Sequence, residues 1–355
     1  MTVKMNDLMR YRGIWLGMAM LWIMLAHSGL RLPSALFEYL KMFGYGGVDL
    51  CLFASGAGCY FSLDADPDGL RFLKRRVLRL APAYLCFCTV WCGFCVCFQG
   101  MNGREVLGNL LGIQYLTGLP GGMNWYIGGL VVYYLLAPYL KSLADRAGSL
   151  RAQAVVICVM LLFTLPFWES DRFIILVTRI PVFYAGMLFA RQCSLGKQIG
   201  RKGIVLFLLG TAAGFGLLFA ALRFLPDVMW AHGWYWYPFL LITPGLCILI
   251  SLAAMKLETG KPGRWLMKLP TLIGRNSFEV FLVHVPLFEA CRYDGYFTKA
   301  LTLLAPGRFT QIPENLLWLC LLPVVAAECF LLKAAERLVC SRSPRRKSQK
   351  SRSAP

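Results

Sequence analysis

Residues 203–222 read GIVLFLLGTAAGFGLLFAAL, a run of twenty residues without a charged side chain. As an α-helix this run is about 30 Å long, which matches the hydrocarbon core of a lipid bilayer. The run therefore predicts a membrane-spanning helix and makes a membrane protein the first hypothesis for the whole chain.

The composition of the other residues supports that hypothesis. Of the 355 residues, 58% are hydrophobic and 15% are charged, whereas soluble domains are about 45–50% apolar and about 25% charged. This composition excludes a water-soluble enzyme and predicts an all-α polytopic membrane protein. About ten transmembrane helices are expected, near residues 12–30, 43–62, 80–99, 124–140, 152–168, 173–190, 203–222, 237–254, 276–291 and 316–337.

The basic residues are distributed unevenly along the chain. The net charge is +19, and 28 of the 37 Lys and Arg residues fall in alternate connections and at the two ends. Cytoplasmic loops carry such an excess, so both termini are expected to be cytoplasmic and no nucleic-acid partner is indicated. Residues 1–340 are expected to form one transmembrane domain. Residues 341–355 are expected to form a basic, disordered cytoplasmic tail that attracts anionic membrane lipids.

Two polar residues lie at similar depth near the outer ends of the first two predicted spans. His27 ends the run LWIMLAH, and Asp49 lies in GVDLCLFASG, which enters the second span from the same face. A carboxylate beside an imidazole fixes its tautomer and stabilises its protonated form, which is what a general base needs. A purely structural pair would show the same pattern, so both interpretations stay open.

Three arginines lie close together at the cytoplasmic entry to the third span, at Arg75, Arg76 and Arg79. Membrane topology alone accounts for basic residues at such a place. Guanidinium groups also suit phosphate, and like charges at helical spacing repel one another unless an anion lies between them. The cluster is therefore a candidate site for a phosphate-bearing ligand or a lipid headgroup.

Three further charged or titratable residues lie inside predicted spans, where each is a functional candidate. Glu279 and His284 are five residues apart, about 140° around a helix, so they are expected to contact different neighbours. Arg179 is expected to pair with an acid, either Asp49 or Glu279. The cysteines that crowd the third span match no zinc spacing, so no metal is expected.

Five segments, taken in order, form a recognisable pattern. They are Arg12-Gly13 through His27; GVDLCLFASG with Asp49, Ser55 and Gly56; FLKRRVLRLAPAY with Arg75, Arg76, Arg79, Pro82 and Tyr84; NWYIGGLVVYYLLAPYL with Trp125, Tyr134 and Pro138; and RIPVFYAGM around Arg179 with the late NSFEVFLVH around Glu279 and His284. In this pattern the chain resembles the acyltransferase family 3 integral membrane proteins, which include O-acetyltransferases of bacterial surface polysaccharides. Arg12 departs from the family, because it lies about one helical turn further from the histidine than usual.

The resemblance implies a multi-pass enzyme of the bacterial-type cytoplasmic membrane. Its donor would be cytosolic acyl-CoA, with acetyl-CoA expected, and its acceptor a hydroxyl of a surface or lipid-linked glycan. His27, oriented by Asp49, would act as general base or carry the acyl group transiently. The coenzyme phosphates would bind the arginine cluster. The implied supporting residues are Arg12, Ser55, Trp125, Arg179, Glu279 and His284.

Two other classes of protein remain as alternatives. Polar residues near the membrane interior also line substrate paths, so a transporter or flippase for a polysaccharide or lipid-linked sugar is the main alternative. Interrupted helices in matching halves would favour it, and the sequence shows no such pair. The third class is an interaction protein that recruits partners through its basic tail.

Overall fold

The computed structural model describes residues 2–119, 125–230, 232–293 and 314–341. It is about 82% helical, which confirms the predicted helical character of the chain. Residues 342–355, which make up nearly all of the predicted basic tail, lie outside the described residues.

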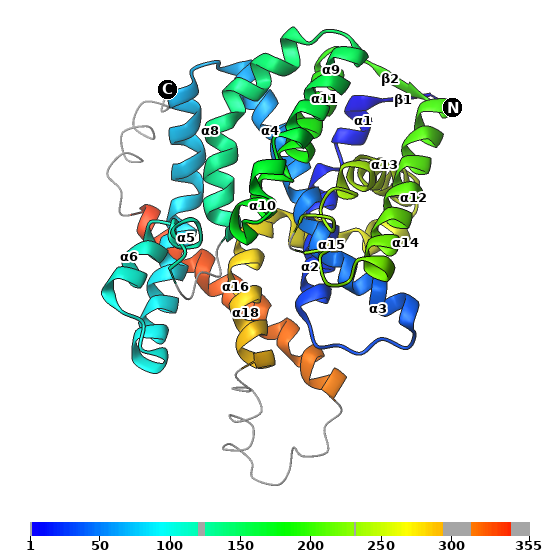
Figure 1. Cartoon of the computed structure of the whole chain (residues 1–355). Coiled ribbons are helices and arrows are strands. Elements are labelled where there is room, and N and C mark those ends of the chain that lie inside the picture. The colour runs from blue at the N-terminus through cyan, green and yellow to red at the C-terminus, as the bar shows by residue number, and fades with distance from the viewer. Residues whose placement is uncertain (1, 120–124, 231, 294–313, 342–355) are drawn as a thin grey trace, which may run out of the picture. The chain divides into compact units, whose positions relative to one another are not determined.

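Each of the ten predicted spans has a corresponding apolar helix in the described part of the chain (Figure 1). Two of these are short, Arg12–His27 and Ser277–Phe288, and their passage through the membrane stays a prediction, as does the side on which the termini lie. The other eight are long and apolar enough to cross a membrane: Ala35–Ala65, Gly69–Gln99, Trp125–Arg146, Leu150–Phe167, Arg172–Ser194, Arg201–Phe224, Phe239–Glu258 and Trp318–Leu338.

The described elements follow one another with short connections. Two helices between α5 and α8, α6 and α7, are too short to span a bilayer. In chain order the elements are β1 (Thr2–Lys4), α1 (Met5–Met9), α2 (Arg12–His27), α3 (Ala35–Met42), η1 (Phe43–Gly46), α4 (Gly47–Ala65), α5 (Gly69–Gln99), α6 (Gly103–Leu110), α7 (Gln114–Thr117), α8 (Trp125–Arg146), α9 (Leu150–Leu162), η2 (Leu165–Phe167), α10 (Asp171–Val177), α11 (Ile180–Ser194), β2 (Gln198–Gly200), α12 (Arg201–Phe224), α13 (Phe239–Glu258), α14 (Lys261–Leu266), α15 (Lys268–Arg275), α16 (Ser277–Tyr293) and α18 (Glu314–Ser341).

The chain divides into two compact units, each built from segments that are distant in sequence. Unit 1 comprises Met1–Ala26, Tyr39–Leu73 and Trp125–Arg275. Unit 2 comprises His27–Glu38, Lys74–Asn124 and Asn276–Pro355. The predicted site residues are therefore divided between the two units, with Asp49 and Arg179 in the first and both His27 and His284 in the second.

In unit 1 the helices α4 and α11 pack backbone against backbone. A Cβ atom added to Gly56 would lie 2.0 Å from the carbonyl oxygen of Phe183, and one added to Gly186 would lie 2.0 Å from that of Phe53. Contacts through small residues are typical of helix pairs in membranes. This close approach fixes the register of the two helices, and the register decides which polar side chains meet at their ends.

A two-stranded antiparallel sheet in unit 1 joins β1 to β2, with Val3 opposite Ile199. The all-α prediction missed it, because strands of three residues give no periodic signal in a sequence. The sheet brings Lys4, the last residue of β1, close to Lys197 and Arg201, the residues that flank β2. Both segments were predicted to lie on the same side of the membrane.

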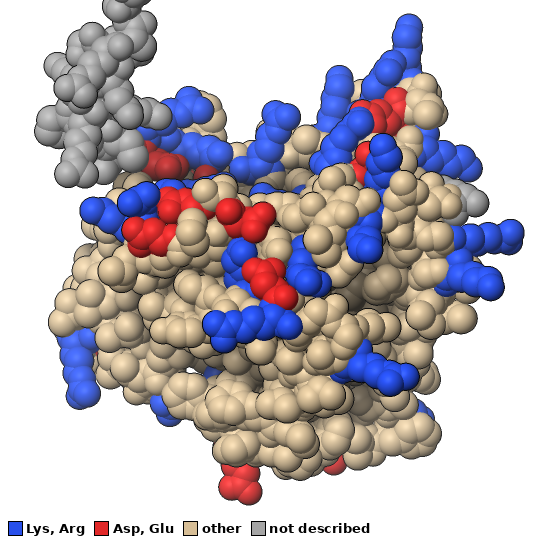
Figure 2. Space-filling view, turned by 90° about the horizontal axis from the view of Figure 1, so that it is seen from above, with Lys and Arg blue, Asp and Glu red and all other residues tan. Residues whose placement is uncertain are grey.

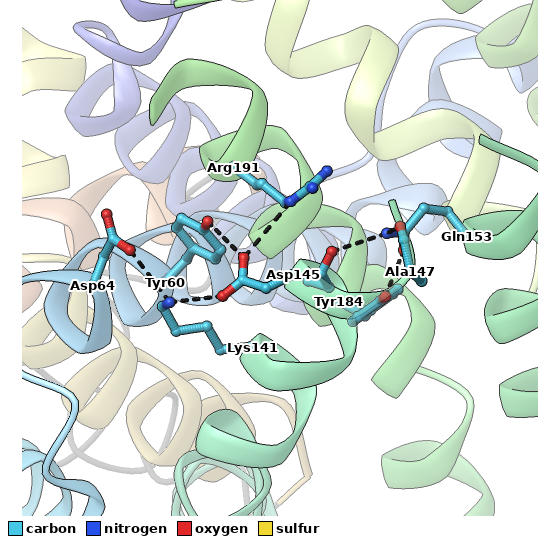
Figure 3. Close-up of polar contacts among 9 residues, drawn as sticks. Tyr60, Asp64, Lys141, Asp145, Ala147, Gln153, Tyr184 and Arg191 are labelled. Atoms are coloured by element: carbon cyan, nitrogen blue, oxygen red, sulfur yellow. Dashed lines mark hydrogen bonds and ion pairs between the residues drawn. The ribbon is translucent and has the colours of Figure 1, made fainter. Parts of the chain in front are cut away.

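The C-terminal ends of three unit 1 helices meet in a polar cluster (Figure 3). Lys141 of α8 lies 2.8 Å from Asp145 and 3.2 Å from Asp64 of α4, measured between nitrogen and carboxylate oxygen. Asp145 also accepts a hydrogen bond from Tyr60 and lies 3.6 Å from the guanidinium of Arg191 on α11. The cluster thus ties together three helix ends whose connections the charge pattern assigned to one side.

Basic side chains gather on the face that Figure 2 shows, with Asp and Glu side chains between them. Surface ion pairs contribute little to stability, typically about 0–1 kcal/mol each. The orienting role of the basic residues in the membrane, which their uneven distribution along the sequence indicates, stays a prediction.

Candidate functional site

Unit 2 brings together the two histidines that the sequence analysis singled out. His27 is the last residue of α2 and His284 lies within α16, yet their ring centroids are 5.4 Å apart, with the rings nearly perpendicular. The sequence placed them on the first and ninth spans and indicated no contact between them. The structure therefore unites the predicted catalytic histidine with a residue that was expected only to support the site.

Three further contacts within unit 2 hold the segment after His27 in this position. A Cβ atom added to Gly29 would lie 2.4 Å from the indole nitrogen of Trp318, so only glycine allows the segment to approach α18 this closely. The backbone of Arg31 exchanges two hydrogen bonds, of 2.8 and 2.9 Å, with the side chain of Asn315. Trp318 in turn packs edge-on against Phe288 of α16 at 5.5 Å, which completes the connection between the segment and the helix that carries His284.

The surroundings of His284 fix its tautomer. The residue is fully buried, and its Nδ1 lies 2.7 Å from the carbonyl oxygen of Val280, one turn earlier on α16. Because a carbonyl oxygen can only accept, Nδ1 carries a proton. Full burial favours the uncharged ring, in which Nε2 holds the lone pair. Nε2 has no hydrogen-bond partner among the described residues. The ring centroids of Phe281 and Phe288, which flank His284 on the same helix, each lie 5.8 Å from the centroid of its imidazole. His284 is therefore a neutral base in aromatic surroundings.

Glu279 turns to a different neighbour, as its spacing from His284 predicted. It pairs with Lys333 of α18 at 3.5 Å, and both side chains are partly buried. The helices α16 and α18 pack against each other in unit 2 (Figure 1), so this ion pair and the Phe288–Trp318 contact lie at two levels of the same helix pair. Glu279 is thus a structural partner of Lys333.

The second predicted site region is a buried ion pair in unit 1. Arg179 and Asp49 are 1% and 0% exposed, and the arginine Nε donates to Oδ2 of the aspartate at 3.2 Å. The sequence left Asp49 and Glu279 as possible partners of Arg179, and the structure selects Asp49. Asp49 lies in the first turn of α4, where a helix N-terminus favours a carboxylate.

Arg179 is held by its position between two helices and by two aromatic rings. Arg179 lies between α10 and α11 and directly precedes α11. The first turn of α11 contains Pro181, a residue that favours a helix start. The guanidinium of Arg179 donates to the carbonyl oxygen of Ile175 at 2.7 Å. The guanidinium carbon lies 3.8 Å from the ring centroid of Trp236 and 4.9 Å from that of Trp125. Such stacking stabilises a desolvated arginine by about 2 kcal/mol. The guanidinium charge of Arg179 is therefore stabilised by the aspartate, by a backbone carbonyl and by two aromatic rings.

The predicted pairing of His27 with Asp49 stays a prediction, because the two residues belong to different units. Within unit 1 the Oδ2 atom of Asp49 is used by Arg179, and Oδ1 is buried without a hydrogen-bond partner among the described residues. One carboxylate oxygen is therefore left to accept a further hydrogen bond.

Two of the implied supporting residues lie elsewhere in unit 1. The guanidinium of Arg12 lies against Gly58 of α4, where an added Cβ would come within 2.4 Å of its Nη1. Ser55 lies on the same helix and is partly exposed. Arg12 thus lies on α2 where this helix contacts α4, and Ser55 lies on α4, both in unit 1. Their part in the site stays a prediction.

The arginine cluster lies on α5, in the portion that belongs to unit 2. Arg75 and Arg79 are exposed and Arg76 is partly buried, all on one continuous helix from Gly69 to Gln99. Further along the same helix the hydroxyl of Tyr84 donates to the carbonyl oxygen of Asn109 in α6. The predicted helical spacing of the cluster is confirmed, and two of its three arginines are exposed residues.

The sequence analysis missed two partners of the site residues. The stacking of Trp236 on Arg179 has no signal in the sequence other than the spacing of aromatic residues. The contact between His27 and His284 joins residues that are far apart in the chain, and nothing in the sequence predicts that they meet. Among the described residues no group of three or more His, Cys, Asp or Glu side chains is arranged to hold a metal ion.

Comparisons with known proteins identify the family to which the chain is related. A family model described as an acyltransferase domain, that of acyltransferase family 3, matches residues 17–334. No curated protein and no solved structure matches the chain. Because the match covers nearly the whole chain, including both histidines and the buried ion pair, this multi-pass membrane protein belongs to acyltransferase family 3.

Proposed function

We propose that the protein is a membrane O-acyltransferase that moves an acyl group, expected to be acetyl, from cytosolic acyl-CoA to a hydroxyl of a surface or lipid-linked glycan. The membrane is expected to be a bacterial-type cytoplasmic membrane. Membership of an acyltransferase family supports the reaction class. The single structural observation that carries the proposal is the contact between His27 and His284, because imidazoles are the side chains that most often move protons in such reactions.

The donor would bind at the arginine cluster. Acyl-CoA carries several phosphate groups, and the exposed guanidinium groups of Arg75 and Arg79 offer planar forks that suit phosphate oxygens. The cytoplasmic side expected for this end of α5 is the side on which acyl-CoA is available. Anionic lipid headgroups offer the same chemistry and are the expected membrane partners.

The reacting groups would meet at His27. In the simplest course its imidazole takes the proton from the acceptor hydroxyl, the hydroxyl oxygen attacks the thioester carbonyl, and the carbon–sulfur bond breaks. The thiolate then takes up the proton, which leaves free coenzyme A and an O-acylated glycan. His27 terminates α2, and a helix C-terminus favours the positive charge that the imidazole gains on the way.

The test replaces the reacting imidazole and reads the product directly. His27→Ala should lower transfer by about 10²–10⁴-fold, the usual contribution of a positioned general base, while the protein still inserts into the membrane. The measurement is mass spectrometry of the surface glycans of cells that carry the variant, compared with cells that carry the unchanged chain or no chain.

A matched control is available in the same chain. His232 also packs against an aromatic ring, that of Trp168 at 5.6 Å, but the proposal gives it no part in the reaction, so His232→Gln should leave glycan acylation unchanged. An acyl mass increment that persists in His27→Ala cells would contradict the proposal.

A further inference from the structure

The lone pair on Nε2 of His284 has no use in the reaction with His27 as the sole base. A buried acceptor without a hydrogen-bond partner is destabilising, and such groups in native structures are few. Here the acceptor is fully buried, belongs to a neutral imidazole, and lies on a ring that contacts His27 at 5.4 Å. Four other buried side-chain atoms among the described residues also lack a partner, including Nδ1 of His232. What distinguishes His284 is that its ring lies against that of His27, the predicted catalytic residue, which suits a group that is completed by a substrate.

An acceptor hydroxyl carries one proton, so a single displacement needs one base. If His27 takes that proton, a second neutral base beside it is redundant. If instead His27 carries the acyl group, its acylated nitrogen has no free lone pair and its other nitrogen points away from the acyl carbon, so the hydroxyl proton needs another base beside the ring. His284 is the neighbouring base whose tautomer leaves a nitrogen ready to accept that proton.

We infer that the reaction proceeds in two steps, with His27 as the acyl carrier and His284 as the general base of the second step. This inference rests on the proposed function and assigns His284 a direct contact with the acceptor hydroxyl.

The two steps balance without any further reagent. In the first, a nitrogen of His27 attacks the thioester carbonyl, the carbon–sulfur bond breaks, and the departing thiolate takes the proton from the other imidazole nitrogen. In the second, Nε2 of His284 takes the proton of the acceptor hydroxyl, the oxygen attacks the acyl carbon, and the bond to His27 breaks. The proton then passes from His284 to His27, which restores both rings.

The contacts of His284 suit this second step. Its Nδ1–H donates to the carbonyl of Val280 in either protonation state, and a carbonyl oxygen stabilises the positive charge that forms when Nε2 is protonated. The aromatic rings of Phe281 and Phe288 keep the ring in place and limit the access of water. A water molecule at this position would hydrolyse the acyl group, so their packing protects the intermediate.

The test separates the two steps by isotope exchange. Purified protein in lipid nanodiscs is incubated with acetyl-CoA and labelled coenzyme A, with no acceptor, and label is followed into acetyl-CoA. The first step alone produces this exchange. His284→Gln should keep the exchange near the unchanged rate, while acylation of surface glycans in cells falls by about 10²–10⁴-fold. His27→Ala should lose both reactions, and His232→Gln neither.

A second variant guards against a folding defect. His284→Ala leaves space where added imidazole can act as the missing base, so imidazole should restore its transfer but should not restore that of His27→Ala. Transfer that persists in His284→Gln would overturn the inference, as would loss of exchange in both His284 variants. If the unchanged protein acylates glycans but shows no exchange, the two-step course is wrong and the proposed function stands. If it shows neither reaction, the proposed function itself fails.

Discussion

Two polar pairs formed by predicted site residues, one in each unit, are built on different principles. In unit 1, Asp49 and Arg179 oppose full charges, and the arginine is also covered by the rings of Trp236 and Trp125. In unit 2, His27 and His284 place two imidazole rings in contact, and one ring keeps an acceptor nitrogen without a partner among the described residues. Each pair leaves one buried acceptor without a hydrogen-bond partner among the described residues, Oδ1 of Asp49 in the first and Nε2 of His284 in the second, but the first joins opposite full charges and the second joins two imidazole rings.

This difference separates stability from reactivity. A buried ion pair is costly to break, because removing one partner leaves an uncompensated charge in a medium of low dielectric. An incompletely satisfied histidine lowers stability slightly in the resting protein, and in exchange it offers a proton acceptor at a defined place. We therefore expect substitutions in unit 1 to act mainly on folding and substitutions of the two histidines to act mainly on chemistry.

The largest effect on stability is expected from Arg179→Leu. The substitution leaves the carboxylate of Asp49 buried and unpaired, which should lower the free energy of unfolding by about 3–5 kcal/mol. Thermal unfolding of the purified protein in detergent measures it. The matched control is the double variant with Asp49→Leu, which buries no charge and should recover much of the loss. A single variant that is as stable as the double variant would show that the pair is not held as the structure has it.

A smaller effect on stability is expected at the contact between α4 and α11, which brings Asp49 and Arg179 together. Gly186→Ala places a Cβ atom 2.0 Å from the carbonyl oxygen of Phe53, so α4 and α11 must separate, at a cost of about 1–3 kcal/mol. The control is Gly210→Ala on α12, where nothing lies within 4 Å of the added atom. That control should leave the unfolding temperature unchanged or slightly higher. Equal effects at the two glycines would argue against the close packing of α4 and α11.

The smallest effect is expected in the polar cluster at the helix ends. Arg191 and Asp145 are 3.6 Å apart and 17% and 39% exposed, so Arg191→Gln should lower the free energy of unfolding by at most about 1 kcal/mol. Salt screens exposed pairs, so this small difference should shrink further in 1 M salt, whereas that of Arg179→Leu should not. Lys202→Gln removes the same charge from an exposed position on α12 and serves as the reference. A loss as large as that of Arg179→Leu would contradict the distinction between buried and exposed pairs.

The sequence predicted the helices of this protein better than it predicted their partners. Backbone groups inside a bilayer must bond within their own segment, so runs such as 203–222 report helices almost directly, and all ten predicted spans have helical counterparts in the described residues. The sequence did not predict the sheet of β1 and β2, whose strands are too short to produce a pattern, nor the short helices between the spans, such as α3, α14 and α15.

Partnerships between helices depend on packing that the sequence does not display. Arg179 had two possible acids, and the choice follows from the approach of α4 to α11 at Gly56 and Gly186. The meeting of His27 with His284 follows from Gly29, which lets the chain after α2 lie against Trp318. In each case a small residue, unremarkable in the sequence, decides which polar groups meet.

The pairing of Thr2–Lys4 with Gln198–Gly200 has a consequence for how the protein is made. At about 5–20 residues per second, the ribosome completes β2 roughly 10–40 s after β1. During that interval the helices that separate the two strands in the sequence must enter the membrane while β1 waits on the same side without its partner. The sheet can therefore close only after α11 has been inserted. By then more than half of the chain has been made. Pairing of the strands also requires that the chain has returned to the side of the membrane on which β1 lies.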